Sequence, residues 1–474
     1  MPPPRGLPTW GDDRIGHAVF GQPPSGDGSY VIHRLESGGY HQPPPGDGSY
    51  RAAVATWRAV DRERRARDSN PQPLTGHIIS NDAASHSLTL QNPCLYRSRW
   101  LRAHGFRYVK VYPRRLEPQA NLTHDSKGFR LMPTSQAWFY RQNQTAYDLE
   151  LGPQSVSDPQ GLGDHDILVA IEGVSLNYRD LVAWKNMAGR AVEGRVPASD
   201  GAGTVLAVGS AVTQWRQGDR VAGCFFPRWQ SGRFDLSNHR FDLGGSLDGM
   251  LRRHVVMHED AWVRVPAHLD TLAASTLPCA ALTAWYSLVV RGGLTHGQTV
   301  LVLGTGGVSI FALQMAKSLG ARVIITSSSD AKLERARALG AEEGVNYRTH
   351  PPWSEQVWSW TGGRGVDLVV EVGGPGTLDQ SMKSVAGGGH IALIGVLTGF
   401  GATTASLFPL LARNVTLNGV YVGPRDAFVQ MNRFLEENRI EPVIDRVFPF
   451  EAAPDAFAYL ASGQHFGKVV IQLA

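Results

Sequence analysis

Apolar runs of strand length recur after residue 298, and segments with a helical spacing of apolar residues follow the first two of them. The runs predict strands at 299–303, 322–326, 367–371, 390–394 and 415–420, and the spacing predicts helices at 310–319 and 331–339. Strands that alternate with helices in this way are typical of a parallel, doubly wound sheet. We therefore expect an α/β fold in this part of the chain.

A different pattern precedes it, with short strands and glycine-rich turns. Residues 166–175 alternate between apolar and polar positions, residues 200–209 form a glycine-rich strand, and residues 218–221 predict a tight turn that enters a strand. This spacing predicts a small all-β unit that ends near Pro266. The apolar stretch at 271–290 contains a proline and several hydroxyl side chains, so it predicts a pair of buried helices and not a membrane span.

The first 131 residues differ from the rest in composition. They contain a short repeat, in which Gly21–Tyr30 recurs almost unchanged as His41–Tyr50, and they hold 18 Lys/Arg against 11 Asp/Glu, although the whole chain has a net charge of only +4. Pro-Pro and Gly-Asp-Gly steps interrupt regular structure. We expect residues 1–131 to form a low-complexity, disordered extension.

Residues 51–67 of this extension (RAAVATWRAVDRERRAR) have the composition of a short basic helix. One interpretation is a contact with nucleic acid or an import signal. The other, which we favour because no aromatic stacking platform accompanies the segment, is the solvated face of a linker helix. We therefore expect no nucleic-acid partner.

The three cysteines exclude two classes of protein. Cys94, Cys224 and Cys279 stand too far apart to build a disulfide framework or a CxxC zinc pattern. The start of the chain also lacks the apolar run of a secretory signal. We expect a reducing, cytoplasmic environment and no membrane partner.

The strongest motif lies in the first turn of the predicted parallel sheet, where Gly304-Thr305-Gly306-Gly307-Val308-Ser309 follows a strand and opens a helix. Gly304 permits a tight turn, Gly306 lets the backbone approach a pyrophosphate, and the free N–H groups of the helix N-terminus favour its negative charge. We expect this loop, including Thr305, Gly307 and Val308, to bind a dinucleotide. Ser309 replaces the third small residue of the usual fingerprint, which predicts a less close contact between helix and strand.

The end of the second strand indicates which dinucleotide is bound. An NAD site usually places an acidic residue there to bind the ribose hydroxyls, whereas this chain has Ser327, Ser328 and Ser329, followed by Lys332 and Arg335. Hydroxyls and cations suit a 2′-phosphate, so we expect NADP(H). The alternative is that both cations are ordinary solvated helix residues. Asp330 is expected to cap a helix that begins at Ala331.

Several motifs together resemble the medium-chain dehydrogenase/reductase superfamily, and most closely its zinc-independent, quinone-oxidoreductase-like and NADPH-dependent alcohol-dehydrogenase-like members. They lie between residues 145 and 474, at 175–180, 199–203, 218–221, 277–285, 304–309, 340–341, 346–348, 361–367 and 467–470. The resemblance implies a GroES-like β catalytic domain over 132–265, a Rossmann cofactor domain over 266–422, and a C-terminal return to the catalytic domain over 423–474.

The resemblance also implies roles for individual residues. Tyr347 would contact the adenosine phosphate, Thr283 would lie near the nicotinamide, and Gly373 and Lys468 would belong to the cofactor site. The strand at 415–422 would pair across a homodimer.

The resemblance further implies that no metal is bound. Zinc members of the superfamily carry a cysteine where Asn177 and Tyr178 stand and a His-Glu pair where Ser199 and Asp200 stand, and the chain lacks their four-cysteine lobe. His254 and His258 could share one face of a strand, but we interpret them as surface or hydrogen-bonded histidines.

Without a metal, a hydrogen-bond donor must stabilise the charge that develops on the reacting oxygen during hydride transfer. Tyr178 is the main candidate, with Asn177 and Asp180 beside it. The alternative is that Asn177 and Asp180 brace the turn while Tyr178 forms a wall of the cleft.

Three functions remain open. The first is NADPH-dependent hydride transfer to or from an alcohol, aldehyde, ketone or quinone. The second is reduction of a carbon–carbon double bond, because residues 176–180 also resemble the enoyl reductase domains of polyketide and fatty-acid synthases. The third is non-enzymatic binding of NADPH.

Overall fold

The computed structural model describes residues 135–155 and 161–473 with their side chains, and the backbone of two strands, β1 (Leu74–Ile79) and β2 (Ser85–Leu90). β1 and β2 pair antiparallel, in a unit distinct from the one that begins at Ser126. The repeat at 21–50, the basic segment at 51–67 and Cys94 lie outside the described residues.

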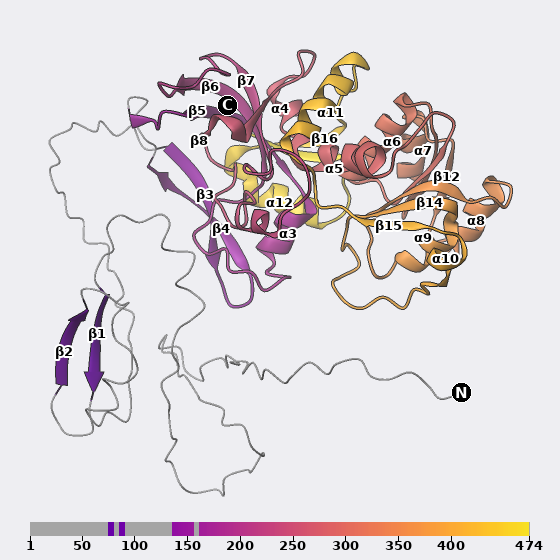
Figure 1. Ribbon diagram of the computed structural model, residues 1–474, viewed down its shortest axis with the longest axis horizontal. Coiled ribbons are helices and arrows are strands. Elements are labelled where there is room, and N and C mark those ends of the chain that lie inside the picture. Colours follow the sequence, from indigo (N-terminus) through magenta and orange to yellow (C-terminus); the bar gives the residue numbers. More distant parts are fainter. Residues whose placement is uncertain (1–73, 80–84, 91–134, 156–160, 474) are drawn as a thin grey trace, which may run out of the picture. The chain divides into compact units, whose positions relative to one another are not determined.

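The cofactor lobe is built on a six-stranded sheet in which all strand pairs are parallel (Figure 1). The strand order is β12-β11-β10-β13-β14-β15, which is the 3-2-1-4-5-6 order of a Rossmann fold. The strands are β10 (Thr299–Val302), β11 (Arg322–Ser327), β12 (Glu343–Asn346), β13 (Val366–Glu371), β14 (Val385–Leu393) and β15 (Thr416–Gly419). The helices among them are α6 (Gly307–Ser318), α7 (Asp330–Ala338), α8 (Trp353–Trp360), α9 (Leu378–Ser384) and α10 (Phe408–Ala412). The predicted doubly wound sheet is confirmed.

The catalytic lobe is built on a second sheet of seven strands, ordered β16-β17-β5-β6-β7-β9 with β8 paired to β5. These strands are β5 (Asp166–Leu176), β6 (Asp200–Val208), β7 (Arg220–Gly223), β8 (His254–His258), β9 (Trp262–Arg264), β16 (Ile444–Pro449) and β17 (Lys468–Gln472). A separate antiparallel pair, β3 (Ser135–Gln142) and β4 (Tyr147–Gln154), precedes them. Two helices, α3 (Tyr178–Trp184) and α12 (Ala453–Ala461), and short turns at Leu236–Arg240, Glu259–Ala261 and Phe450–Ala452 complete the lobe.

The C-terminal segment returns to the catalytic sheet and touches the cofactor lobe. β17 pairs antiparallel with β5, with Val470 opposite Ser175. Just before β17, Gly467 forms a bridge with Gly306, and its N–H donates to the Thr305 carbonyl (3.0 Å). The end of β5, the glycine-rich loop and the start of β17 therefore meet at one place.

The segment that precedes β10 is helical and buried, as the apolar stretch predicts. It consists of α4 (Thr271–Ala274), a π-helical turn (Leu277–Ala281), α5 (Leu282–Trp285) and a second π-helical turn (Tyr286–Arg291). α11 (Arg425–Glu437) packs against α5 and β9. Among the described residues, no helix combines the length and apolar character that crossing a membrane requires.

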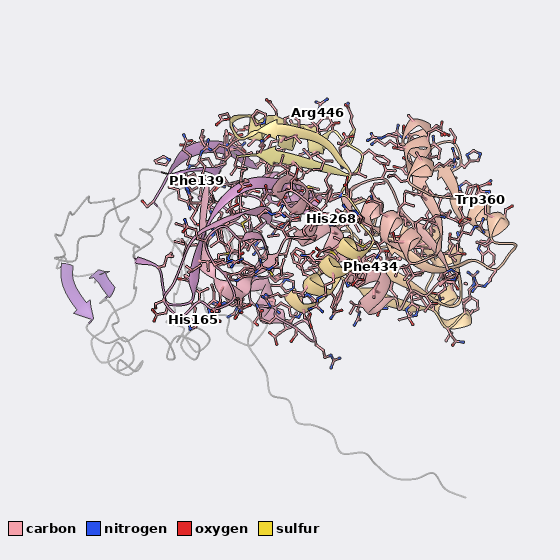
Figure 2. All side chains as sticks on the ribbon, turned by 90° about the horizontal axis from the view of Figure 1, so that it is seen from above. Phe139, His165, His268, Trp360, Phe434 and Arg446 are labelled. Atoms are coloured by element: carbon pink, nitrogen blue, oxygen red, sulfur yellow. The ribbon has the colours of Figure 1, made fainter. Side chains whose placement is uncertain are left out.

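Each lobe has an apolar core, and the larger core extends across the junction of the lobes. It includes Phe311 of the cofactor lobe together with Phe225 and Trp229, which follow β7. In Figure 2, Trp360 marks the far end of the cofactor lobe, Phe139 and His165 mark the catalytic lobe, and His268 and Phe434 lie between them.

The predicted cap of α7 is wrong by one residue. Ser329, and not Asp330, is the N-cap, and its hydroxyl accepts a hydrogen bond from the Lys332 N–H. Asp330 is the first helical residue, where an acidic side chain still interacts favourably with the helix dipole.

Candidate cofactor and substrate site

The glycine-rich loop leaves β10 in a turn that needs a left-handed backbone. Gly304 has φ +71°, and its N–H donates to the Thr326 hydroxyl (3.1 Å) on the neighbouring strand. Gly306 then caps α6, which begins at Gly307. A Cβ on Gly307 would stand 2.6 Å from Cδ of Lys468, so any larger residue would displace that side chain. The loop thus presents the N-terminus of α6 at the carboxyl end of β10, where anions bind.

Ser309, which replaces the third small residue of the dinucleotide-binding fingerprint, has a structural role. The residue is buried, and its hydroxyl donates to the Leu303 carbonyl (2.6 Å) at the end of β10. A side-chain hydrogen bond therefore joins helix and strand where a third glycine would allow close backbone contact.

The predicted adenosine-binding residues lie together at the ends of β11 and β12. Ser327 is buried and Ser328 is half-buried. The Tyr347 N–H donates to the Ser327 carbonyl (3.0 Å), which holds the exposed tyrosine beside the serines.

The two predicted phosphate cations have different surroundings. Nζ of Lys332 donates to the Gly463 carbonyl (2.8 Å) and to the His465 carbonyl (2.9 Å). An ammonium group has three donors, so one remains for a ligand. Arg335 instead pairs with Asp445 (3.1 Å), which holds it on the C-terminal segment.

Lys468 lies at the junction of the lobes and is only 3% exposed. Its Nζ donates to the Leu176 carbonyl (2.8 Å) at the end of β5 and to Oδ1 of Asn177 (2.6 Å) at the N-cap of α3. The lysine therefore joins the last strand of the chain to the turn that carries the predicted catalytic residues.

Two buried carboxyl groups lie near this amine. Asp180 accepts the Asn177 backbone N–H (2.8 Å), and burial raises its pKa to about 6. Asp200 accepts hydrogen bonds from the Ser199 hydroxyl (2.7 Å) and the Cys279 N–H (3.1 Å). Burial raises the pKa of Asp200 and lowers that of Lys468, while the attraction between the two groups opposes both shifts.

An aromatic cavity of about 760 Å³ is lined by residues of both lobes. Trp229 and Phe234 contribute from the loop after β7, Tyr286 from the helical segment, and Tyr421 from the chain just after β15. The Trp229 and Phe234 rings meet edge to face with centroids 5.0 Å apart. Such walls suit a bulky, planar, largely apolar ligand.

Comparison with known proteins assigns the fold to a family. Residues 163–267 match the family model of the alcohol dehydrogenase GroES-like domain, and residues 307–437 match that of the zinc-binding dehydrogenase. A zinc-type alcohol dehydrogenase-like protein of Schizosaccharomyces pombe is 40% identical over 333 residues, which cover 68% of this chain and 95% of that protein. The chain belongs to the medium-chain dehydrogenase/reductase superfamily.

Two further matches agree with this assignment. A crystal structure of a Sinorhizobium meliloti protein described as an alcohol dehydrogenase is 43% identical, with a TM-score of 0.67, over 72% of this chain and all of that one. The 2-methylene-furan-3-one reductase of Solanum lycopersicum is 30% identical over 362 residues, which cover 74% of this chain and 83% of that protein. As a member of the superfamily, the protein is an oxidoreductase that uses a nicotinamide cofactor.

The name of the second family model implies zinc, and the residues present do not fit that metal. Lys468 donates to Asn177 Oδ1 and to the Leu176 carbonyl, so an amine holds the oxygen atoms at this point. Burial and the neighbouring Asp200 raise the pKa of the Cys279 thiol far above its usual range. Within residues 135–155 and 161–473, no group of three or more His, Cys, Asp or Glu side chains could hold a metal.

The histidines considered in the sequence have other partners. Nδ1 of His254 hydrogen-bonds with the Ser135 hydroxyl (2.9 Å). The His258 ring stacks on that of His165, with centroids 5.6 Å apart. His254 is therefore hydrogen-bonded on the catalytic sheet, and His258 is an exposed residue at the end of β8.

The residues to which the superfamily resemblance gave catalytic or nicotinamide-binding roles differ in their contacts. Hydrogen bonds join Asn177 to Asp180 and to Lys468. Tyr178 is the first residue of α3, and its ring packs against the apolar core of the catalytic lobe. Thr283 is buried in α5.

The loop after β13 is held by a buried acid. The Gly373 N–H donates to Oε1 of Glu371 (2.7 Å), as does the Thr377 hydroxyl (2.6 Å). Glu371 therefore holds the backbone of the predicted cofactor residue Gly373 at the carboxyl end of β13.

Sequence reasoning did not identify three residues that the structure brings to the site. Tyr421 lines the aromatic cavity, Asp200 faces Lys468, and His465 lies beside the glycine-rich loop. Their positions in the sequence were the available signals. Asp200 is the first residue of a predicted strand, Tyr421 directly follows another, and His465 stands two residues before the Gly467-Lys468 motif.

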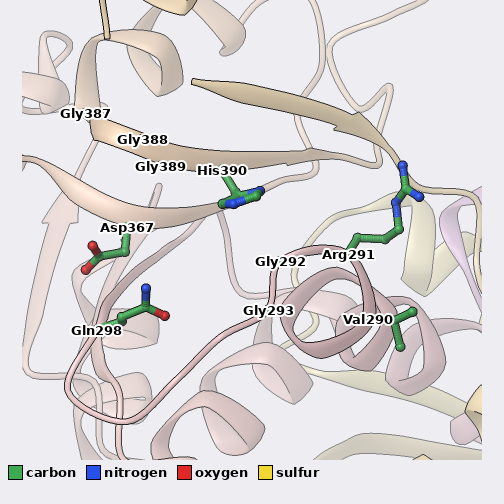
Figure 3. Close-up of a pocket in the computed structure, with 10 residues that line it drawn as sticks. All are labelled: Val290, Arg291, Gly292, Gly293, Gln298, Asp367, Gly387, Gly388, Gly389 and His390. Carbon is green, nitrogen blue, oxygen red and sulfur yellow. The ribbon is translucent and has the colours of Figure 1, made fainter. Parts of the chain in front are cut away.

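A second cavity, of about 340 Å³, lies at the amino ends of the strands of the cofactor sheet, whereas the glycine-rich loop lies at their carboxyl ends. Figure 3 shows it between the helical segment with Val290 and Arg291 and the glycines 387–389 of β14, near Asp367 and Gln298. Asp367 and Gln298 stand at the amino ends of β13 and β10. Because ligands of doubly wound sheets bind at the carboxyl ends, this cavity is not the cofactor site.

Proposed function

We propose that the protein is a zinc-independent, NADP(H)-dependent oxidoreductase that transfers a hydride between the nicotinamide and a bulky carbonyl compound or quinone. The observation that carries this proposal is the buried Lys468 amine, which is hydrogen-bonded where zinc members of the superfamily place metal ligands. A basic group there balances the charge of Asp200 without a metal.

Lys468 also sets the orientation of a candidate donor. Because a lysine amine that is charged can only donate, the Asn177 amide must turn its oxygen toward Lys468 and its nitrogen away. That nitrogen is buried, and a hydrogen bond from the Asn177 side chain to Asp200 lowers the pKa of that carboxyl. We assign the Asn177 amide and the Tyr178 hydroxyl as donors to the substrate oxygen, and Asp180 as the brace of the turn.

The preference for NADP(H) is supported by the end of β11. Ser327 and Ser328 stand where an acid would bind the ribose of NAD, and Lys332 has one donor left after its two carbonyl contacts. We assign these three residues, with Tyr347, to the adenosine 2′-phosphate.

The aromatic cavity supports a bulky substrate, and a relative keeps reduction of a double bond open as a second function. The tomato protein, named for the reduction of a methylene-furanone, is 30% identical to this chain. An enone carries the same oxygen as a ketone, so the same donors would stabilise the charge that forms on it.

A substrate panel tests the proposal. NADPH oxidation is followed at its absorbance maximum with a quinone, an aromatic aldehyde and an enone, before and after dialysis against a zinc chelator. We expect turnover of at least one compound, no loss after dialysis and less than stoichiometric zinc by elemental analysis. Stoichiometric zinc, or activity that a chelator abolishes and zinc restores, would overturn zinc independence.

We also propose a homodimer. Among the strands that the structure describes, β15 ends the parallel sheet and has one neighbour, and Leu407, Phe408 and Leu411 before it are exposed. An open strand edge beside exposed apolar side chains suits pairing with a second copy. Light scattering should give twice the chain mass for the wild type and the monomer mass for Leu411→Asp; a monomeric wild type would refute the dimer.

A further inference from the structure

The C-terminal segment brings a histidine to the glycine-rich loop. Nε2 of His465 lies 4.0 Å from the position that a Cβ would take on Gly306. The Gly306–Gly467 bridge and the hydrogen bond from Gly467 to Thr305 hold this segment against the loop. His465 therefore faces the N-terminus of α6, where the pyrophosphate of a dinucleotide would lie.

The surroundings of this histidine are basic. Lys332 on α7 donates to the His465 carbonyl, and the positive charges of Lys332 and of Lys468 on β17 both disfavour a protonated imidazole. The facing acid is Asp445 on β16, which is already paired with Arg335. Burial, followed by the two lysines, lowers the pKa of His465 to about 4.

One ring nitrogen is unpaired. Nδ1 of His465 is buried and has no hydrogen-bond partner among the described residues. The other ring nitrogen, Nε2, is the atom that lies nearest Gly306, so Nε2 is the group that a pyrophosphate at the loop would meet.

We propose that His465 is a coenzyme ligand, which hydrogen-bonds the pyrophosphate and takes up a proton when the nucleotide binds. The inference rests on the proposed coenzyme site and adds a residue and a proton to it. The doubly negative pyrophosphate reverses the local balance of charge, because it attracts the imidazolium that the two lysines repel. The protonated ring then makes a charge-assisted hydrogen bond, which is stronger than a neutral one.

Lysine cannot provide this pH dependence. Lys332 makes hydrogen bonds to two carbonyl oxygens, and Lys468 makes hydrogen bonds to the Leu176 carbonyl and to Oδ1 of Asn177. Histidine is the side chain whose ordinary pKa lies closest to neutrality. Coenzyme affinity should therefore strengthen as the pH falls from 8 toward 5.5, by up to about tenfold for each unit by which the pKa of His465 in the complex exceeds 5.5.

The test is calorimetric titration of the full chain with NADP⁺, which is stable in acid, at pH 5.8 in MES and in bis-Tris. These buffers have different heats of ionisation, so the difference between the two measured heats gives the protons taken up. The 2′-phosphate also titrates near pH 6, and it contributes equally to every variant. The quantity compared is therefore the difference between the wild type and His465→Gln, which keeps an N–H donor and cannot be protonated.

We expect the wild type to take up roughly half a proton more per site than H465Q. It should also take up more protons than H465N, in which the amide nitrogen replaces Nδ1. His254→Gln is the matched control, because burial also lowers the pKa of His254 while its ring bonds to Ser135, and it should behave as the wild type does. Equal uptake by the wild type, H465Q and H465N would overturn the role of His465. Absence of any binding heat with NADP⁺ and with NAD⁺ in the wild type would instead overturn the coenzyme site itself.

Discussion

Replacing Lys468 by methionine should destabilise the protein strongly. The change removes the donors to the Leu176 carbonyl (2.8 Å) and to Oδ1 of Asn177 (2.6 Å), and it leaves the buried Asp200 without its positive neighbour. Each orphaned acceptor costs about 1–3 kcal/mol, and the loss of the attraction between Lys468 and Asp200 adds to that cost. We therefore expect the free energy of unfolding to fall by about 2–5 kcal/mol.

Urea unfolding at pH 7.5, followed by tryptophan fluorescence and far-UV circular dichroism, measures this loss. The matched control is Lys332→Met, because Nζ of Lys332 also donates to two carbonyl oxygens but the side chain is only partly buried. The control should lose about 1 kcal/mol.

The double variant K468M/D200N isolates the pair. Once Asp200 is neutral, the loss of Lys468 should cost less, with a coupling energy of at least about 1 kcal/mol. A K468M variant that loses less than about 1 kcal/mol, or a double variant whose loss is the sum of the single losses, would refute the pairing of Lys468 with Asp200.

Three other substitutions test separate parts of the site. Asp180→Asn should gain stability relative to the wild type as the pH rises from 4 to 7, because the native carboxyl has a pKa of about 6 against an ordinary 3.8 and keeps a proton that the unfolded chain has already lost. The gain is at most about 3 kcal/mol, and equal differences between the urea midpoints of the two proteins at pH 4.5 and at pH 7.5 would contradict it. Lys332→Glu should weaken NADPH binding about tenfold or more and change NADH binding little, because the new charge repels the 2′-phosphate; equal shifts in the two dissociation constants would count against the phosphate assignment. Gly307→Ala places a Cβ 2.6 Å from Cδ of Lys468 and should cost about 1–3 kcal/mol in urea unfolding and weaken coenzyme binding. Gly401→Ala, with no atom within 4 Å of its new Cβ, should be neutral in the same unfolding assay.

The parts of the fold that depend on local patterns were predictable. Apolar runs separated by helical spacing predicted the parallel sheet, and the glycine spacing from Gly304 placed the phosphate loop between β10 and α6. Even so, the cap of α7 was misplaced by one residue. Ser329 and Asp330 are both good capping residues, and only the backbone path decides which hydroxyl or carboxyl meets the Lys332 N–H.

The chemistry of the site depends on contacts between residues that are far apart in the chain. Asn177 and Lys468 are 291 positions apart and meet at 2.6 Å because β17 pairs with β5. Lys332 was expected to face a phosphate, and most of its donors go to carbonyl oxygens of the C-terminal segment. Spacing along the sequence contains no information on either contact.

By itself the sequence determined the parallel sheet and the loop for a dinucleotide, because both follow from backbone conformation and apolar periodicity over a few residues. Only the tertiary structure decided that a buried amine meets the turn at Asn177, and that a histidine faces the loop. Pairing of strands from opposite ends of the chain creates both features, and burial then gives their charges the strength that they would not have in water.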